Sequence, residues 1–255
     1  MDMLDHVKAW GDPESPTVVL LPGAGGTQWL WTPHAELLDD EYRILSMDMP
    51  AHGRHPDSSF TFDRAIDDIG VLLDENGPAV LVGHSLGGHV AMEAAAAHEN
   101  QVDGLLVAGV NSAPGLLAGG RQWVLSCVIE VAAHSTHVRS WMDEQYGLDD
   151  DQQVPPDEVE THDEAVATAR GMRGALFRDS LSALNSYDGP TLLAYGEDEA
   201  GSETVEKLAE RVGARLRWYD GEHGLPSREP AVFSEIIEEF LTTVYDGNPV
   251  ALETS

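Results

Sequence analysis

The sequence is poor in cysteine and has no long hydrophobic run. Cys127 is the only cysteine among 255 residues, so no disulfide can form within the chain. Because a single thiol without a family signature is usually a small buried hydrophobe, we interpret Cys127 as a core residue and not as a nucleophile. No apolar run reaches the roughly 20 residues of a membrane helix, and the N-terminus lacks the basic and apolar segments of a signal peptide. These absences predict a soluble, cytoplasmic protein with no membrane partner.

Positive charge is also scarce. Only 14 Lys and Arg oppose 45 Asp and Glu, which gives a formal net charge of −31, and Lys8 and Lys207 are the only lysines. A chain this acidic cannot replace the counterions around a phosphate backbone, so nucleic acid is not expected as a partner. Because the acidic residues are spread along the chain, it resembles proteins of organisms that keep molar salt in the cytoplasm, where a Debye length of about 3 Å screens their repulsion. An ordinary acidic protein is the alternative.

The residues that are present favour a globular domain of α/β class. A content of 42% hydrophobic residues with 25 Gly and 14 Pro excludes disordered, collagen-like and coiled-coil chains. Short apolar runs of the kind found in buried parallel strands occur at Thr17–Leu21, Arg43–Met47, Ala79–Val82, Leu105–Gly109, Thr191–Tyr195 and Arg215–Tyr219. Segments with helical periodicity occur at Phe62–Glu75, Leu86–His98, Thr204–Val212 and Ala231–Val244. This alternation predicts a mostly parallel central sheet flanked by helices.

Residues 114–186 interrupt the alternation with amphipathic stretches and no strong strand. We therefore predict a core made of residues 1–113 and 187–246, with a helical cap inserted at 114–186. Residues 247–255 are expected to form a fraying tail.

The most informative motif is Gly83-His84-Ser85-Leu86-Gly87, which follows a predicted strand and opens a predicted helix. A serine on such a sharp turn presents its hydroxyl above the carboxyl edge of the sheet, and the two glycines remove side chains that would clash there. The alternative is a serine that only caps the helix.

A serine hydroxyl needs a base before it becomes a good nucleophile. We assign the base to His223, because it follows the last predicted strand and so belongs to the same edge as Ser85. The acid that orients it is expected in the preceding carboxyl-end loop, where Asp198 is our choice over Glu197 and Glu199. A solvated loop residue is the alternative for both the base and the acid.

An oxyanion hole is expected from the backbone N–H groups of Leu86, just after the serine, and of Ala24, in the glycine-rich loop after the first major strand. The same loop does not complete a G-x-G-x-x-G pattern, and no phosphate-binding G-x-x-x-x-G-K-[ST] occurs. We therefore expect no nucleotide and no other cofactor.

The pairs His52 with His55 and His134 with His137 have spacing compatible with metal binding, but no further ligands stand beside them. We expect structural or solvated roles for these four histidines, and no metal.

Three residues close to these motifs are candidates for substrate contact. Trp29 and Trp31 follow the glycine-rich loop, and His84 precedes the serine. Packing under the insertion is the alternative for the two tryptophans.

The motifs and their order resemble the α/β-hydrolase superfamily, in particular its esterase-like members with a helical cap. The resemblance covers Val18–Ser112 and Tyr187–Leu241 and includes Asp48-Met49-Pro50-Ala51-His52-Gly53-Arg54, which is similar to the family's loop after the next strand. Two departures are Pro22, where many relatives have a histidine that braces the oxyanion loop, and Ala51, where the family usually has glycine. A serine nucleophile also argues against the dehalogenases and epoxide hydrolases of this fold, which attack with an aspartate.

The resemblance implies a serine hydrolase that acts on a small or medium carboxylic ester, thioester or lactone, with a small molecule as its only required partner. A carbon-carbon bond hydrolase or cofactor-free lyase with the same residues is the enzymatic alternative. A non-catalytic small-molecule receptor on the same fold is the alternative from another class.

Overall fold

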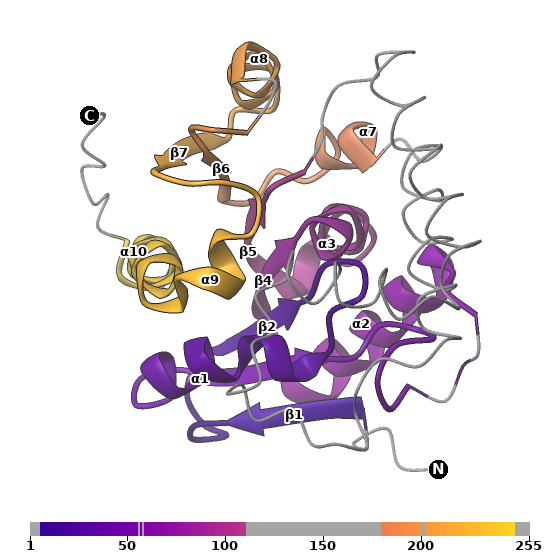
Figure 1. Ribbon diagram of the computed structural model, residues 1–255. Coiled ribbons are helices and arrows are strands. Elements are labelled where there is room, and N and C mark those ends of the chain that lie inside the picture. Colours follow the sequence, from indigo (N-terminus) through magenta and orange to yellow (C-terminus); the bar gives the residue numbers. More distant parts are fainter. Residues whose placement is uncertain (1–5, 56, 58, 111–179, 200–201, 248–255) are drawn as a thin grey trace, which may run out of the picture.

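The computed structural model describes most of the predicted core (Figure 1). The described residues are 6–55, 57, 59–110, 180–199 and 202–247. The predicted cap lies outside them except for 180–186, as do the predicted tail beyond residue 247, Cys127, His134 and His137.

The described strands form one seven-stranded sheet in the order β1-β3-β2-β4-β5-β6-β7. Their bounds are β1 Val7–Trp10, β2 Thr17–Leu21, β3 Arg43–Met47, β4 Ala79–His84, β5 Val102–Ala108, β6 Thr191–Gly196 and β7 Arg215–Tyr219. Every neighbouring pair is parallel except β1 with β3, which is antiparallel. The predicted α/β class with a mostly parallel sheet is confirmed.

Burial on both faces explains the continuous apolar runs. In β2, all five residues are buried. Val19 and Leu21 belong to one hydrophobic cluster, whereas Val18 and Leu20 belong to the other, because successive side chains of a strand point to opposite faces. The sheet therefore separates two cores, and each needs a layer of helices to cover it.

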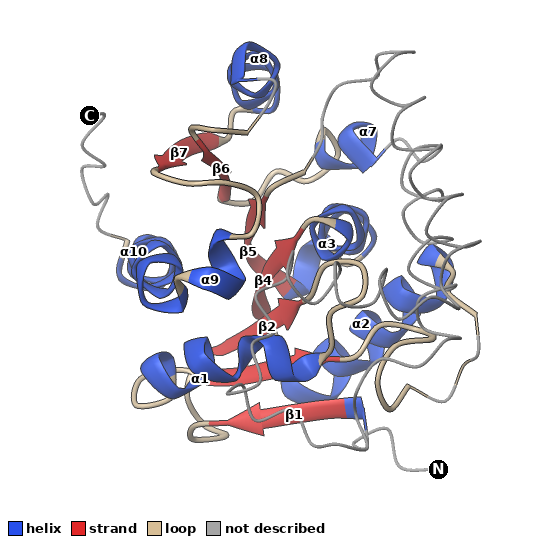
Figure 2. Ribbon diagram, viewed as in Figure 1, coloured by secondary structure: helices blue, strands red, loops and turns tan. Residues whose placement is uncertain are grey.

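Helices cover both faces of the sheet (Figure 2). Their bounds are α1 Thr32–Leu38, α2 Phe62–Asn76, α3 Leu86–Ala97, α7 Ser180–Leu184, α8 Ser202–Val212, α9 Leu225–Arg228 and α10 Pro230–Asp246, with short 3-10 helices η2 Gln28–Trp31 and η3 Glu99–Gln101. Buried side chains of α2, α3 and α8 belong to one cluster, and those of α1, α9 and α10 to the other. None of the described helices is both long and apolar enough to cross a bilayer.

Local sequence signals set the ends of two long helices. The Thr61 side chain accepts a hydrogen bond from the N–H of Arg64 at 3.2 Å and so caps the start of α2. Helix α10 begins at Pro230, whose missing N–H costs nothing in a first turn, and ends before Gly247 in the left-handed conformation.

The carboxyl ends of the six parallel strands lie at one edge of the sheet. The chain runs outward from β2 to β3 and then returns to β4 on the other side of β2. Open α/β sheets usually bind ligands where the strand order reverses in this way. Here the reversal lies between the loops after β2 and β4. The glycine-rich loop follows β2, and Ser85 follows β4.

Candidate active site

Ser85 occupies a sharp turn between β4 and α3. Its φ of 53° and ψ of −114° lie in a region that non-glycine residues rarely adopt. A methyl group on Gly83 would lie 2.4 Å from the carbonyl oxygen of Gly87, and one on Gly87 would lie 2.3 Å from that of Leu21. Both positions therefore require glycine, as the motif predicts.

A backbone hydrogen bond holds Ser85 in this turn, and the lack of a side-chain capping bond distinguishes it from an ordinary helix cap. Its backbone N–H donates to the carbonyl of Ala108 on the neighbouring strand at 2.9 Å. Although Ser85 directly precedes α3, its side chain makes no capping hydrogen bond. A methyl group on Gly23 would lie 3.3 Å from the Ser85 Cβ, so the glycine-rich loop passes directly beside the serine.

His223 lies at the same edge of the sheet, in the loop between β7 and α9. Its Nδ1 is 3.2 Å from Oε2 of Glu199, and its side chain is 43% exposed. A carboxylate can only accept, so Nδ1 carries the proton and Nε2 keeps a free lone pair. A neutral histidine in this tautomer can take a proton from a hydroxyl group.

Asp198, the predicted partner of His223, does not make this contact. Its side chain is exposed, and its backbone N–H donates to the carbonyl of Gly221 at 3.3 Å. The turn after β6 closes through the N–H of Glu199 and the carbonyl of Gly196 at 3.1 Å, which turns Glu199 back toward β7. We therefore correct the assignment: the carboxylate that contacts His223 belongs to Glu199 and not to Asp198.

Three donors surround the Glu199 carboxylate. The Gly196 N–H and the Tyr219 hydroxyl each lie 3.0 Å from Oε1, while Oε2 faces His223. Burial alone would raise the pKa of Glu199, but the hydrogen bond and charge of His223, with the other two donors, bring its pKa below the ordinary value. The carboxylate is therefore ionised beside the imidazole. Tyr219, the last residue of β7, is a contributor that the sequence analysis missed.

The two expected oxyanion donors belong to the segments next to Ser85: Leu86 follows it in the chain, and Ala24 follows Gly23, which passes beside it. Leu86 is the first residue of α3, where N–H groups have no partner within the helix and the helix dipole favours negative charge. Ala24 stands in a turn closed by the Gly26 N–H and the Gly23 carbonyl at 3.0 Å, with Gly25 at a φ of 82°. That positive φ requires glycine at the third position of the turn.

Asp48 contacts the segment that follows the glycine-rich loop. Its fully buried carboxylate accepts hydrogen bonds from the Gln28 N–H at 2.6 Å and from the Gln28 side-chain amide at 3.1 Å. It also accepts from the Arg54 N–H at 2.9 Å. One carboxylate thus joins the loop after β2 to the loop after β3.

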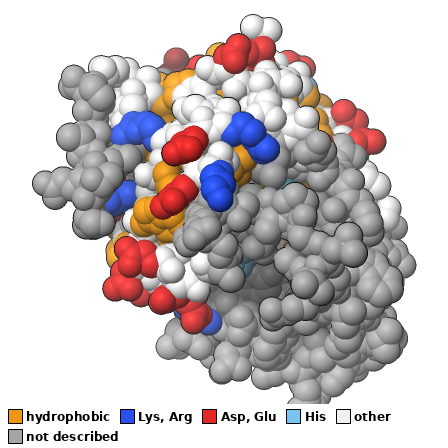
Figure 3. All heavy atoms as spheres, turned by 90° about the horizontal axis from the view of Figure 1, so that it is seen from above, with side chains coloured by type: hydrophobic (Ala, Val, Ile, Leu, Met, Phe, Trp, Pro, Cys, Tyr) orange, Lys and Arg blue, Asp and Glu red, His pale blue; other side chains and the backbone are white. Residues whose placement is uncertain are grey.

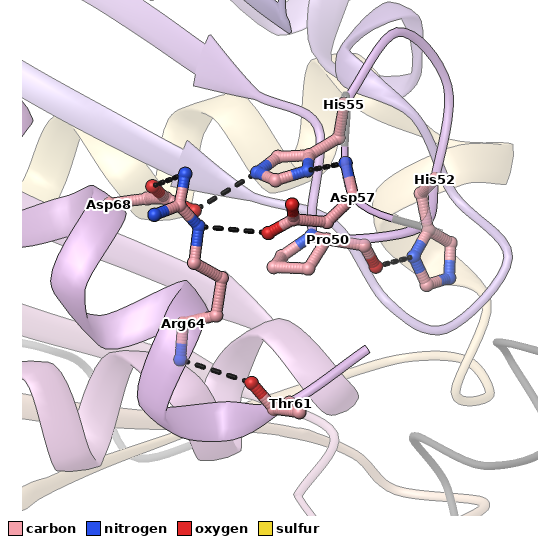
Figure 4. A network of polar contacts seen from close by, with 7 residues as sticks. All are labelled: Pro50, His52, His55, Asp57, Thr61, Arg64 and Asp68. Carbon is pink, nitrogen blue, oxygen red and sulfur yellow. Dashed lines mark hydrogen bonds and ion pairs between the residues drawn. The ribbon is translucent and has the colours of Figure 1, made fainter. Parts of the chain in front are cut away.

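His52 and His55 have structural contacts in the loop after β3 (Figure 4). The Nδ1 of His52 lies 3.0 Å from the Pro50 carbonyl, and the Nε2 of His55 lies 3.0 Å from Asp68 on α2. Asp68 also pairs with Arg64 at 3.1 Å. In the described part of the chain, no group of three or more His, Cys, Asp or Glu side chains is arranged to hold a metal ion.

The structure places the two candidate tryptophans differently. Trp31 is fully buried and packs with His34 and Phe233, so it is part of the core. Trp29 is partly buried, and the Lys8 ammonium lies 3.6 Å from the centre of one of its rings, where a cation and an aromatic face attract. For Trp31 the structure favours packing over the predicted substrate contact, but the packing is against α1 and α10 and is not the expected packing under the insertion.

His84 is also placed differently from the prediction. Its side chain is 1% exposed, and its Nε2 lies 2.8 Å from the backbone carbonyl of His223. It therefore contacts the loop that carries His223, and its burial favours a supporting role over the predicted substrate contact.

Proteins of known family are similar to this chain in sequence. The sequence model of the alpha/beta hydrolase family matches residues 18–236. Lipase LipV of Mycobacterium tuberculosis is 36% identical over 105 residues, a match that spans 40% of each chain. A protein of Variovorax paradoxus named "Putative carbamate hydrolase RutD" is 25% identical over 94% of this chain and 96% of its own.

Solved structures share the fold. A structure from work on carboxylesterases of Nitrososphaera gargenis superposes with a TM-score of 0.78 at 17% identity, covering 95% of this chain and 96% of that one. The enol-lactonase of Burkholderia xenovorans superposes with a TM-score of 0.73 at 19% identity, covering 93% and 96%.

Proposed function

Because the chain belongs to the alpha/beta hydrolase family and is a hydrolase, we propose that it cleaves a small or medium carboxylic ester through an acyl-enzyme on Ser85. The observation that carries the proposal is the strained conformation of Ser85 at the edge where His223 is paired with Glu199. Backbone strain at a serine that makes no capping bond is a common property of nucleophiles on this type of turn. The match to a lipase supports an ester as the substrate.

In the first half of the reaction, the Ser85 hydroxyl oxygen attacks the ester carbonyl carbon while His223 Nε2 takes its proton. The carbonyl oxygen becomes an oxyanion, which the N–H groups of Ala24 and Leu86 stabilise. The tetrahedral intermediate then expels the alkoxide, to which His223 returns the proton. The products of this half are an alcohol and an acyl-Ser85 ester.

In the second half, water replaces the alcohol. His223 removes a proton from the water, whose oxygen attacks the acyl carbon, and the proton then passes to Ser85 as the acid leaves. Glu199 keeps the Nδ1–H tautomer and stabilises the imidazolium that forms twice in each cycle. The proposed cycle consumes only the ester and water.

The proposal is tested by hydrolysis of a substrate panel by the wild-type enzyme and Ser85→Ala. The panel contains p-nitrophenyl esters of increasing acyl length, a thioester, a lactone and a β-diketone. We expect turnover of the shorter esters and a loss of roughly 10³-fold or more in Ser85→Ala, because only binding and the oxyanion hole would remain. Ser186→Ala, at an exposed serine in the turn after α7, is the matched control.

Two results would contradict the proposal. Ser85→Ala with a tenth of the wild-type rate would remove Ser85 from the mechanism. Cleavage of the β-diketone without cleavage of any ester would replace the proposal with carbon-carbon bond hydrolysis by the same residues.

A further inference from the structure

His223 needs support beyond its own packing. Its side chain is 43% exposed, and Gly221 and Gly224 stand on either side of it in the loop. Gly221 has a φ of 138°, so this segment uses backbone freedom that only glycine supplies easily. Polar contacts must therefore fix the position of the imidazole.

His84 supplies such a contact to the backbone of His223. Its Nε2 lies 2.8 Å from the His223 carbonyl oxygen, although the two residues are 139 positions apart. Because a carbonyl can only accept, the proton of His84 resides on Nε2. The hydrogen bond to the His223 carbonyl thus determines the tautomer of His84.

The rings of the two histidines also pack together. Their centroids are 4.7 Å apart at an angle of 43°. A methyl group on Gly109 would lie 2.7 Å from Nδ1 of His223 and 3.3 Å from Nε2 of His84, so both rings lie against this glycine. His84 therefore contacts His223 through its backbone carbonyl and through its ring.

We propose that His84 is a positioning residue: as the neutral Nε2–H tautomer it fixes the loop that carries His223, so that the imidazole keeps its contact with Glu199 at the edge that carries Ser85. This inference rests on the proposed function of Ser85 and His223. Because His84 is 1% exposed, we expect it to make no contact with the substrate or the reacting atoms.

A neutral ring suits this position. Burial, and next the charge of His223, lower the pKa of His84 to about 3. His84 thus stays uncharged in neutral and mildly acidic solution. A permanent cation at the same place would oppose the imidazolium that forms on His223 during the reaction.

The test compares His84→Gln with His84→Asn. The amide nitrogen of glutamine can occupy the place of Nε2 and donate to the His223 carbonyl, whereas that of asparagine corresponds to Nδ1 and cannot reach it. We expect His84→Gln to keep kcat within about threefold of wild type and His84→Asn to lose about 10²-fold, the scale of effect caused by misplacing a catalytic group by about 1 Å. KM should change little in either variant, because we expect no contact between His84 and the substrate.

His98→Gln serves as the matched control, because this histidine stands at the far end of α3 and packs against Gly70. Loss of kcat in His84→Asn that His84→Gln restores supports the inference. Full kcat in a folded His84→Asn variant, or equal losses in both variants, would overturn it. A wild-type enzyme whose Ser85 does not react with a fluorophosphonate would overturn the proposed function as well.

A measurement on the wild-type protein does not depend on the variants folding. Nitrogen-proton correlation spectra of the histidine rings should show His84 with its proton on Nε2 from about pH 5 to 8. A proton on Nδ1, or a doubly protonated ring in that range, would overturn the inference.

Discussion

At the scale of single residues, the site depends on a serine held in an unfavourable conformation. A non-glycine residue in a sparsely populated region costs about 1–3 kcal/mol and persists only where its surroundings enforce it. Here, the hydrogen bond from Ser85 to Ala108 and the close approaches at Gly83 and Gly87 enforce it. The fold therefore fixes the backbone that carries the Ser85 hydroxyl.

The pairing of His223 with Glu199 predicts unequal effects of two neighbouring substitutions. Glu199→Gln should lower kcat by about 10⁴-fold, because the amide no longer selects the Nδ1–H tautomer or stabilises the imidazolium. Asp198→Asn should stay close to wild type, because the Asp198 side chain is exposed and makes no contact with His223. Steady-state kinetics on one ester would measure both.

The reverse order of losses would return the role to Asp198. Thermal unfolding of both variants provides the control, since a folded Glu199→Gln protein is needed to attribute its loss to chemistry.

Sequence alone locates Ser85 and His223 at this edge but does not choose the acid. The position of each residue after a strand is enough to bring Ser85 and His223 to the same edge. The choice between Asp198 and Glu199 depends on how the turn after Gly196 closes and on the extra methylene that lets Glu199 reach back. Neither property leaves a pattern in the sequence.

At the scale of elements, strands buried on both faces were the most predictable. β2 and β3 have the predicted bounds, because their mostly buried positions require continuous apolar or β-branched runs. β7 also has the predicted bounds, although it is an edge strand with mostly partial burial. β1 was missed since it is a short antiparallel edge strand with only partial burial. The short helices α1 and α9 were missed because four to seven residues carry too little periodicity to stand out.

The loops after β2 and β3 function as one unit through Asp48. Asp48→Asn would turn an amide nitrogen toward N–H donors of Gln28 or Arg54 and loosen the glycine-rich loop. We expect kcat to fall about 10- to 100-fold, with KM less affected, because the Ala24 N–H would lose its fixed position. Kinetics on the folded variant would measure this.

Asp57→Asn offers a control for Asp48→Asn, because its half-exposed carboxylate pairs with Arg64 at the surface at 3.0 Å. Unchanged kcat in Asp48→Asn would show that the loop holds its conformation without this carboxylate.

At the scale of the whole molecule, the net charge of −31 predicts dependence on salt. On the face shown in Figure 3, acidic side chains lie in several separate places and not in one patch. At about 0.01 M salt, a Debye length of about 30 Å lets them repel across the molecule, whereas at about 1 M only close neighbours interact. We expect Tm and hydrolysis to rise steeply from dilute buffer to molar KCl. A thermal scan that is flat over this range would contradict adaptation to salt.

Four histidines with lowered pKa values predict acid sensitivity. Burial is the largest cause that lowers the pKa of His34 and His84 to about 3 and of His52 and His89 to about 4, from 6.5. Above pH 6.5 both states are neutral at these rings, and below it the unfolded chain binds more protons. The free energy of unfolding should therefore fall as pH drops below 6.5, by about 1.4 kcal/mol per pH unit per histidine.

Urea unfolding in molar KCl, which screens the changing charge of the carboxylates, would measure this slope between about pH 8 and 5. His34→Phe keeps a ring between Trp31 and Phe233. It should reduce the slope of the unfolding free energy against pH by the contribution of one histidine. A free energy of unfolding that is constant over this range would contradict burial of these rings in the neutral form.

The central claim is that Ser85 is a nucleophile activated by His223, and covalent labelling tests it most directly. The wild-type protein is treated with a fluorophosphonate, and the adduct is located by mass spectrometry of the digested chain. We predict one phosphonyl group, attached to Ser85, with no labelling of Ser85→Ala and much slower labelling of Glu199→Gln. An adduct on another residue, or labelling that survives in Ser85→Ala, would contradict the account.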